Sequence, residues 1–154
     1  MTLIAYMLSY IMKIVLDTNI LVAALRSEGG AARGVFRLAL QEKIEPVVGA
    51  ALYAEYEDVL SRKPPFERSI LDQKDRETLF DALMSVSTWT KIHYLWRPNL
   101  RDADDDHIVE LAVASGAKWI VTENIRDFQN GELIFDSFRI ARARTFLEVW
   151  ETRR

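Results

Sequence analysis

Cysteine is absent from the 154-residue sequence, and histidine is rare, occurring only as His93 and His107. The lack of cysteine excludes disulfide bonds, thiolate metal sites and cysteine nucleophiles, and it is typical of a cytoplasmic protein. The two histidines do not have the H-x-x-x-H spacing of a helical metal site, and we interpret both as structural or surface residues. Any bound metal ion is therefore expected to be held mainly by oxygen atoms.

Several sequence motifs of catalysis and phosphate binding are also missing. There is no G-x-G-x-x-G, no P-loop, and no serine or lysine in a recognisable nucleophile motif. The formal net charge of −3 does not indicate a nucleic-acid partner, although an acidic site and a basic rim can coexist in one protein. The composition, 49% hydrophobic and 28% charged, is that of an ordinary globular domain.

The first eleven residues are mostly apolar, but the stretch is too short to span a bilayer. It has neither the basic start nor the cleavage site of a signal peptide, so we expect no membrane anchor and a cytoplasmic location. Met12 precedes KIVLDTNILVAAL, which reads as the start of a domain. We expect a single domain over residues 12–154, with residues 1–11 as an extension. This extension is either the product of an upstream start codon or an additional strand or arm that packs on a partner.

Short apolar runs alternate along the chain with segments of helical periodicity. This alternation predicts an α/β fold with a mainly parallel sheet of about five strands, because parallel neighbours need crossover helices. The strand at 13–16 is expected to be central, since its continuous apolar run is typical of a strand buried on both faces. The other predicted strands are 44–48, 88–95, 118–122 and 140–143, and the helices are 20–25, 31–42, 50–62, 75–86, 105–115 and a terminal helix with a Thr145–Glu148 capping box, plus a helical turn at 69–73.

Acidic and polar residues follow the predicted strands at the points where the strands end. In parallel α/β sheets the carboxyl ends of the strands meet at one edge, where ligands bind. We therefore expect one site that combines side chains distant in sequence. Its candidate residues are Asp17, Asp102, Asp105, Thr122, Asn124 and Asp127, with Glu55 one turn into the helix after the second strand.

Four of these acids crowd into the run Asp102, Asp104, Asp105 and Asp106 at the start of a predicted helix. Acids in a first helical turn interact favourably with the helix dipole, so part of the run is explained without any ligand. Four carboxylates in five residues also repel one another, and a hard divalent cation between them relieves that repulsion. Oxygen-only ligands favour Mg²⁺ or Mn²⁺. We expect Asp105 as a ligand with Asp102 beside it, and Asp104 and Asp106 as helix-start charge.

Each acid taken singly has an ordinary interpretation as a helix cap, a turn residue or a solvated surface charge. Their predicted convergence at one sheet edge is what favours a functional site. Because no histidine is predicted within reach of the acids, the expected nucleophile is metal-activated water, as in phosphodiester hydrolysis.

Three blocks of the sequence resemble the PIN-domain ribonucleases, particularly the virulence-associated protein C-like toxins of type II toxin-antitoxin pairs. The blocks are VLDTNILVAAL at 15–25, AEYEDVLSR at 54–62, and RDADDDHIVELAVASGAKWIVTENIRDF at 101–128. Residue by residue, the resemblance implies Asp17, Glu55, Asp105 and Asp127 as catalytic metal-binding acids with Asp102 as a further metal residue, and Asn19, Thr122 and Asn124 as polar support. Glu57 competes with Glu55, and Asn124 stands where many members have aspartate.

The resemblance implies a PIN-like three-layer α/β/α sandwich and endonucleolytic RNA cleavage that depends on Mg²⁺ or Mn²⁺. It also implies a cognate antitoxin protein as partner and a homodimer. A basic rim flanks the acid-bearing segments, comprising Arg26, Arg33, Arg62, Lys63, Arg97, Arg101 and Arg126. Of these, Arg26, Arg62, Arg101 and Arg126 are the candidate RNA-binding residues, unless they are ordinary solvated charge.

Two alternatives to a ribonuclease toxin remain open at this level. The first is a catalytically silent PIN-like module that binds RNA or a protein and uses the acids structurally. The second is another Mg²⁺-dependent phosphate enzyme on a doubly wound sheet, which is disfavoured because the first strand lacks a D-x-D motif and no phosphate-binding loop is present.

Overall fold

The computed structural model describes residues 11–92, 106–129 and 137–153 of the chain. Residues 1–10, on which the prediction of an N-terminal extension mainly rests, lie outside these ranges. So do Asp102 and Asp105. The sheet already involves Met12, because the backbone N–H of Glu45 donates to the carbonyl of Met12 at 2.8 Å.

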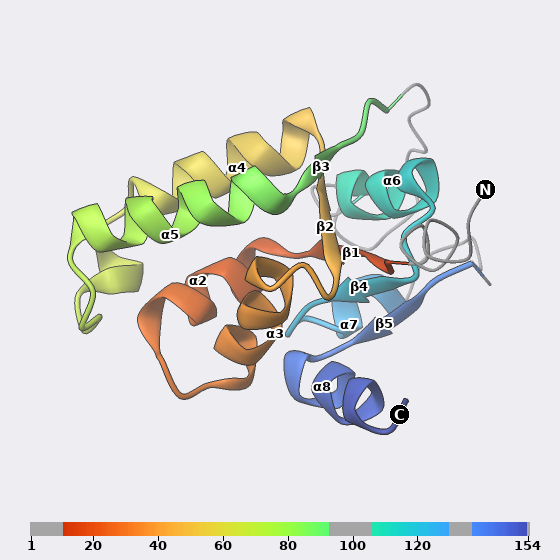
Figure 1. The fold of residues 1–154 in the computed structure, drawn as a ribbon. Coiled ribbons are helices and arrows are strands. Elements are labelled where there is room, and N and C mark those ends of the chain that lie inside the picture. The colour runs from red at the N-terminus through yellow and green to blue at the C-terminus, as the bar shows by residue number, and fades with distance from the viewer. Residues whose placement is uncertain (1–10, 93–105, 130–136, 154) are drawn as a thin grey trace.

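Five parallel strands form the sheet, in the order β3-β2-β1-β4-β5 (Figure 1). The register places Val15 beside Ile120 in the central pair of β1 and β4. This confirms the predicted number of strands and the central position of the first one. The strands are β1 Lys13–Leu16, β2 Glu45–Val48, β3 Thr88–Trp89, β4 Trp119–Val121 and β5 Arg139–Ala141.

Helices cover both faces of the sheet, which gives the expected three layers. Helix α6 packs against β1, β2 and β4. In Figure 1, α3 and α8 lie on the other side of the sheet from α6, in contact with each other. The described helices are α2 Thr18–Arg26, α3 Ala31–Leu40, α4 Ala50–Leu60, the 3₁₀ turn η1 Pro64–Phe66, α5 Gln73–Val86, α6 Asp106–Ser115, α7 Arg126–Gln129 and α8 Ala143–Glu151.

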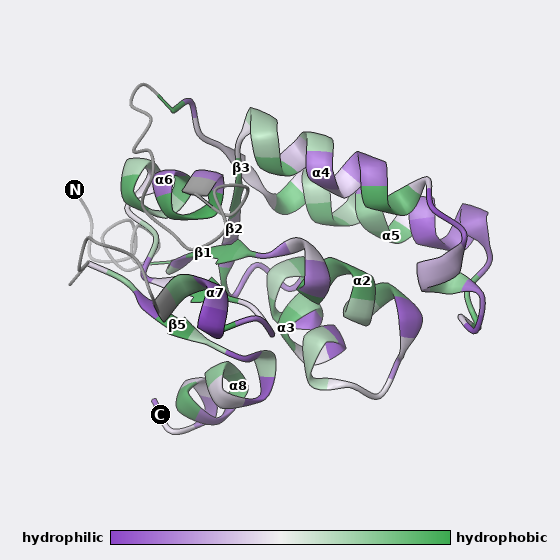
Figure 2. Ribbon diagram, turned by 180° about the vertical axis from the view of Figure 1, so that it is seen from behind, coloured by the Kyte–Doolittle hydropathy of each residue, from purple (hydrophilic) through white to green (hydrophobic). Residues whose placement is uncertain are grey.

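The hydrophobic core is centred on the two middle strands. Ile14, Val15, Ile120 and Val121 are completely buried, as expected for apolar runs sandwiched between helical layers. Figure 2 shows the contrast between the hydrophobic central strands and the hydrophilic far ends of α4 and α5. The apolar face of α8 closes the core through Phe146, whose side chain is 1% exposed.

The sheet grows from β1 in both directions, so its topological switch point lies next to β1. The chain passes from β1 to β2 and β3 on one side, and then returns through α6 to β4 on the other side. In such sheets the ligand site lies outside the carboxyl ends of the strands at this switch point. Here those ends belong to β1 and β4, so that Asp17 and Thr122 follow neighbouring strands.

Three local predictions are wrong, each for a reason of backbone geometry. Helix α2 begins at Thr18, two residues earlier than expected, because Asp17 is its N-cap and the Asp17 carboxylate accepts from the N–H of Thr18. Helix α8 starts earlier than expected, with Arg142 as its N-cap, so the predicted capping box lies inside the helix. The helical turn expected at 69–73 occurs instead at 64–66, where two prolines suit the first turn of a helix.

The third and fourth strands are shorter than predicted. Strand β3 ends at Trp89, and residues 90–92 are not in a strand. Residues 93–95 of the predicted strand are outside the described part of the chain.

The turn from α6 into β4 contains Gly116 at φ +73°, a left-handed conformation that favours glycine. No helix in the described ranges is long and apolar enough to cross a membrane.

Candidate active site

The centre of the candidate site is the carboxylate of Asp17, the residue directly after β1. Its side chain is buried, with the residue only 5% exposed. Oδ1 accepts a hydrogen bond from the N–H of Thr18 at 2.8 Å, and Oδ2 accepts one from the hydroxyl of Thr122 at 2.8 Å. The first bond caps α2, and the second joins the ends of β1 and β4. Asp17 therefore has both the capping role and the site position that the sequence suggested.

Thr122 and Asn19 complete a polar network around this carboxylate. The amide Nδ2 of Asn19 donates to Asp17 Oδ2 and to Thr122 Oγ1, both at 3.2 Å. The fully buried Thr122 hydroxyl also accepts from the N–H of Asn124 at 3.1 Å. Asn19 Oδ1 in turn accepts from the N–H of Glu123 at 3.1 Å. Every polar atom of the Asn19 and Thr122 side chains thus orients the carboxylate or the turn after β4.

A second carboxylate, Glu55, faces this network from α4. Its Oε2 atom lies 2.8 Å from Nε2 of His107, the second residue of α6. That atom is buried and has no partner with hydrogen-bond geometry, so the contact is an electrostatic one made when the imidazole is protonated. Glu55 and His107 both act electrostatically on Asp17. The site therefore combines residues that follow or precede three different strands.

Tyr56 fixes the position of α4 relative to the site. Its ring is 2% exposed, and its hydroxyl donates to the backbone carbonyl of Leu16, the last residue of β1. Burial raises the pKa of the Tyr56 hydroxyl well above its usual value, and the negative charges of Asp17 and Glu55 raise it further. Tyr56 is therefore a neutral donor that holds Glu55, its neighbour in sequence, next to the end of β1.

The pKa of the Asp17 carboxyl is raised above its ordinary value of 3.8. Burial is the largest cause, because a low-dielectric environment disfavours the charged form. The hydrogen bonds from Thr122 and Thr18 oppose it, the charge of Glu55 adds to it, and His107 lowers it. The hydrogen-bond donors thus do not fully compensate the burial of this carboxylate. A cation beside it would do so.

The side chains of the remaining predicted site residues are not seen in the hydrogen-bond network around Asp17. Asp127 lies half-buried in the first turn of α7 and makes no side-chain hydrogen bond with any described residue. It is not among the groups that affect the charge of Asp17. Asn124 is exposed and contributes through its backbone, accepting from the N–H of Asp127 at 3.1 Å. Asp102 and Asp105 are outside the described ranges.

Glu57, the alternative to Glu55, points elsewhere. It is exposed and lines a cavity between α4 and α5, together with Tyr53 and Phe80. Residues two apart on a helix are separated by about 200° around its axis, so only one of the two glutamates can face β1. The helix geometry therefore favours Glu55.

The candidate RNA-binding arginines are scattered around the molecule. Arg26 ends α2, about 13 Å along the helix from Asp17. Arg62 is exposed and forms an ion pair with Asp58 at the end of α4. Arg126, which begins α7, is exposed and is closest in sequence to the end of β4. Arg101 lies outside the described residues.

The chemistry of the donors fits a hard divalent cation, of whose shell the described residues would supply a part. Asp17 and Glu55 provide carboxylate oxygens, and Glu55 Oε2 is a buried atom without a hydrogen-bond donor. No group of three or more acidic or histidine side chains that could hold an ion occurs within residues 11–92, 106–129 and 137–153. The further ligands expected from sequence, Asp102 and Asp105, lie in the stretch between the first two ranges.

Comparison with protein families decides the classification of this arrangement. The sequence matches the PIN domain family over residues 13–126, which is most of the chain. The protein belongs to the PIN domain family. The match runs from the first residue of β1 to the first residue of α7, and it includes Asp17, Glu55 and Thr122.

A solved structure supports the same fold for this PIN domain. A chain in the crystal structure of VapBC2 from Rickettsia felis, bound to a DNA fragment from their promoter, is similar with a TM-score of 0.57. The similarity covers 84% of the present chain and 97% of that chain, at 15% sequence identity. At this identity the likeness concerns the fold alone. The comparison with curated proteins found no match.

Three residues that contact the candidate site of this PIN domain were not found by sequence reasoning. His107 was interpreted as structural or surface, although it contacts Glu55. Tyr56 gave no signal of its own, because a buried tyrosine on an amphipathic helix reads as core. Glu123 caps the start of α8 by accepting from the N–H of Ala143 at 3.2 Å, while its own N–H donates to Asn19. Its position directly after Thr122 was the available signal.

Replacing Thr122 with valine is expected to destabilise the protein by about 1 to 3 kcal/mol. The change removes a donor to Asp17 and leaves the N–H of Asn124 without its acceptor. Loss of such an outer-shell partner is also expected to weaken metal binding by about 10-fold to 100-fold. Chemical denaturation and a Mn²⁺ titration measure the two effects. Thr145→Val, on the exposed side of α8, is the matched control, and equal behaviour of the two variants would show that the network is dispensable.

Proposed function

We propose that this PIN domain is a metal-dependent endoribonuclease that hydrolyses RNA phosphodiester bonds, and that it is the toxin of a toxin-antitoxin pair. The observation that carries the proposal is the buried Asp17 carboxylate at the switch point of the sheet. It is oriented by Thr122 and Asn19 and faced by a second carboxylate, Glu55. The hydrogen bonds do not fully compensate the burial of Asp17, and a divalent cation between Asp17 and the half-exposed Glu55 would balance the charge of both carboxylates.

The proposed ligands of Mg²⁺ or Mn²⁺ are Asp17, Glu55, Asp105 and Asp127, with Asp102 beside them. A bound ion of this kind lowers the pKa of water and stabilises the charge that builds on a phosphoryl oxygen. The described residues contribute orientation. Thr122 and Asn19 hold one carboxylate, and His107 holds the other.

His107 gives the site a further property. Its Nε2 atom lies 2.8 Å from Glu55, so a protonated imidazole offsets part of the acidic charge in the absence of an ion. Its side chain is 14% exposed, which shields the contact from solvent. We assign His107 the role of positioning Glu55, because it contacts this carboxylate and no reacting group.

We infer the binding partners from the protein family and from the exposed positive charges near the site. RNA phosphates are proposed to contact the exposed arginines near the site, of which Arg126 is the best placed in the described chain. The similar R. felis structure is a VapBC2 complex, and a protein antitoxin is proposed here as the cognate partner. We also propose a homodimer and a location in the cytoplasm, where RNA is accessible.

The test is cleavage of single-stranded RNA by the purified protein with Mn²⁺, with Mg²⁺, and with EDTA. Cleavage is expected with either ion and none with EDTA. Glu55→Gln is expected to lower the rate by about 10-fold to 100-fold, because it removes one charge from the site while keeping its shape.

Glu57→Gln is a matched control on the same helix, and its rate is expected to equal that of the unmodified protein. A larger loss in Glu57→Gln than in Glu55→Gln would reverse the assignment. If the unmodified protein does not cleave RNA with either ion but still binds it, the silent binding module replaces the nuclease.

A further inference from the structure

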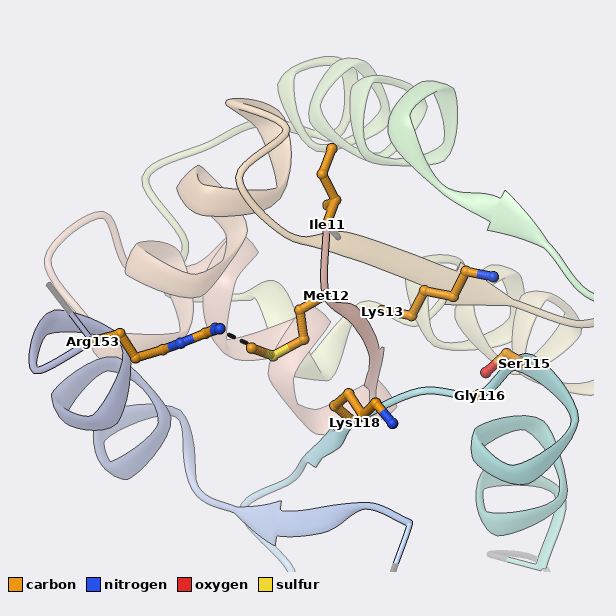
Figure 3. A pocket seen from close by; sticks show the side chains of 7 residues that line it. All are labelled: Ile11, Met12, Lys13, Ser115, Gly116, Lys118 and Arg153. Carbon is orange, nitrogen blue, oxygen red and sulfur yellow. Dashed lines mark hydrogen bonds between the residues drawn. The ribbon is translucent and has the colours of Figure 1, made fainter. Parts of the chain in front are cut away.

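A cavity of about 370 Å³ opens at the edge of the sheet opposite Asp17, at the amino ends of β1 and β4. It is lined by the start of β1, the turn between α6 and β4, and the C-terminal end of α8 (Figure 3). Three of its lining residues are cationic, and none is acidic. The lining residues are Ile11, Met12, Lys13, Ser115, Gly116, Lys118 and Arg153.

Within the described part of the chain, these three cations have no acidic partner. Among the described residues, neither Lys13 nor Lys118 forms an ion pair or a side-chain hydrogen bond. The two lysines are adjacent in the sheet, since the N–H of Lys118 donates to the carbonyl of Lys13 at 2.9 Å. Arg153 is held by apolar groups, with its guanidinium 5.4 Å from the Trp150 ring centre and its Nη1 3.9 Å from the sulfur of Met12.

Basic residues near helix C-termini have a simpler explanation, because they interact favourably with the helix dipole. The hydrogen bonds at the ends of these two helices give this explanation limited support. The chain itself occupies two of the last four carbonyls of α6, with Ala112 accepting from Ala117 at 3.0 Å and Val113 from Gly116 at 3.3 Å. The carbonyl of Trp150 in α8 likewise accepts from the N–H of Arg153 at 3.3 Å. Backbone groups therefore cap part of each helix end without a lysine or arginine side chain.

The concentration of positive charge is also unusual for this chain, which carries a net charge of −3. Three cations and no acid line this one hollow, which favours an anion as its occupant. A guanidinium and two ammonium groups match a phosphate, which carries up to about two negative charges and several acceptor oxygens.

We propose that this cavity, whose cations are Lys13, Lys118 and Arg153, is a binding site for a phosphate ester. Its volume is in the range of sites for small organic ligands and exceeds what a lone ion needs. Ile11 and Met12 provide an apolar wall for the organic part of the ligand. The phosphate comes either from a free nucleotide or from the backbone of an RNA strand.

The site is independent of the proposed catalysis. Lys13 and Asp17 stand at opposite ends of β1, about 13 Å apart by the rise of a strand. The inference goes beyond the nuclease proposal, and it holds or fails whether or not the protein cleaves RNA.

The experiment is an NMR titration of the full-length ¹⁵N-labelled protein with inorganic phosphate in EDTA. Chelation removes divalent ions that would bring phosphate to the acidic edge, and sodium chloride keeps the ionic strength constant. Saturable shifts are expected for the amides of Gly116, Lys118 and Arg153. The double variant Lys13→Gln/Lys118→Gln is expected to bind phosphate at least about tenfold more weakly, since it loses two charge-assisted contacts.

Arg68→Gln/Lys74→Gln is the control, because it makes the same change of net charge at exposed positions away from the cavity. Equal phosphate affinity of the two double variants overturns the proposal. So does reproduction of the amide shifts by sodium chloride alone. Tighter binding of AMP than of phosphate identifies a nucleotide site, and tighter binding of a five-nucleotide RNA identifies a backbone contact. Failure of both esters to shift these amides rules out a phosphate-ester site.

Discussion

Asp17→Asn is expected to reduce metal-dependent RNA cleavage by about 10²-fold to 10³-fold, which is the scale for losing one preorganised electrostatic group. Asparagine keeps the shape of the side chain and one acceptor oxygen, so the cap on α2 can persist. It removes the negative charge that is buried beside Thr122 and faces Glu55. The rate should fall chiefly in kcat at saturating Mn²⁺ if the charge acts in the chemical step.

The measurement is single-turnover cleavage of a labelled RNA across a range of Mn²⁺ concentrations. Asp81→Asn, at an exposed position of α5, makes the same chemical change away from the site and should cleave at the unmodified rate. Undiminished cleavage by Asp17→Asn would remove Asp17 from the mechanism. In a cell, growth arrest on expression should likewise disappear in Asp17→Asn.

The same substitution is expected to change stability little without metal and strongly with metal. The folded-state pKa of Asp17 is raised above 3.8. The neutral carboxyl contributes its full stability below the unfolded pKa, and this contribution is lost as the pH rises through the folded pKa. In the metal-free protein the charged carboxylate is therefore the form that burial penalises. Asp17→Asn removes that charge but puts an amide nitrogen where Oδ2 accepts from Thr122 and Asn19, so its melting temperature in EDTA should lie close to that of the unmodified protein.

With Mn²⁺ at about 100 times its dissociation constant, the unmodified protein should gain about 2.7 kcal/mol. For a protein of this size that corresponds to a rise in melting temperature of about 5 to 10 °C. Asp17→Asn should show little of this rise. Thermal unfolding at pH 5 and pH 7 checks both parts, because the metal-induced rise should be smaller at the lower pH as protons compete for the carboxylate. An equal metal-induced rise in both proteins would contradict the metal assignment.

The fold was largely predictable because its strands are buried on both faces. Such strands read as continuous apolar runs, and KIVL and WIV both lie at the centre of the sheet. Short edge strands carry less of this signal. The predicted strand at 88–95 proved to begin correctly but to end at Trp89, since nothing in the sequence showed where its pairing with β2 stops.

The candidate site was predictable only in part. Asp17, Asn19 and Thr122 stand directly beyond strands, where the topology of parallel sheets brings side chains together, and the structure joins them by hydrogen bonds. His107 could not be found in this way. A lone histidine in a helix has no spacing that reveals a partner, and its contact with Glu55 depends on how α6 and α4 pack.

By itself, the sequence determined the α/β class, the parallel sheet with its central first strand, and the acidic and polar residues that follow the strands. Periodicity, apolar runs and residue types are local properties of the chain. The tertiary structure alone decided which glutamate of α4 faces Asp17 and that His107 lies against it. It also decided that Lys13, Lys118 and Arg153 surround one cavity. These facts depend on the rotation of helices and on contacts between segments more than 30 residues apart, which no local pattern encodes.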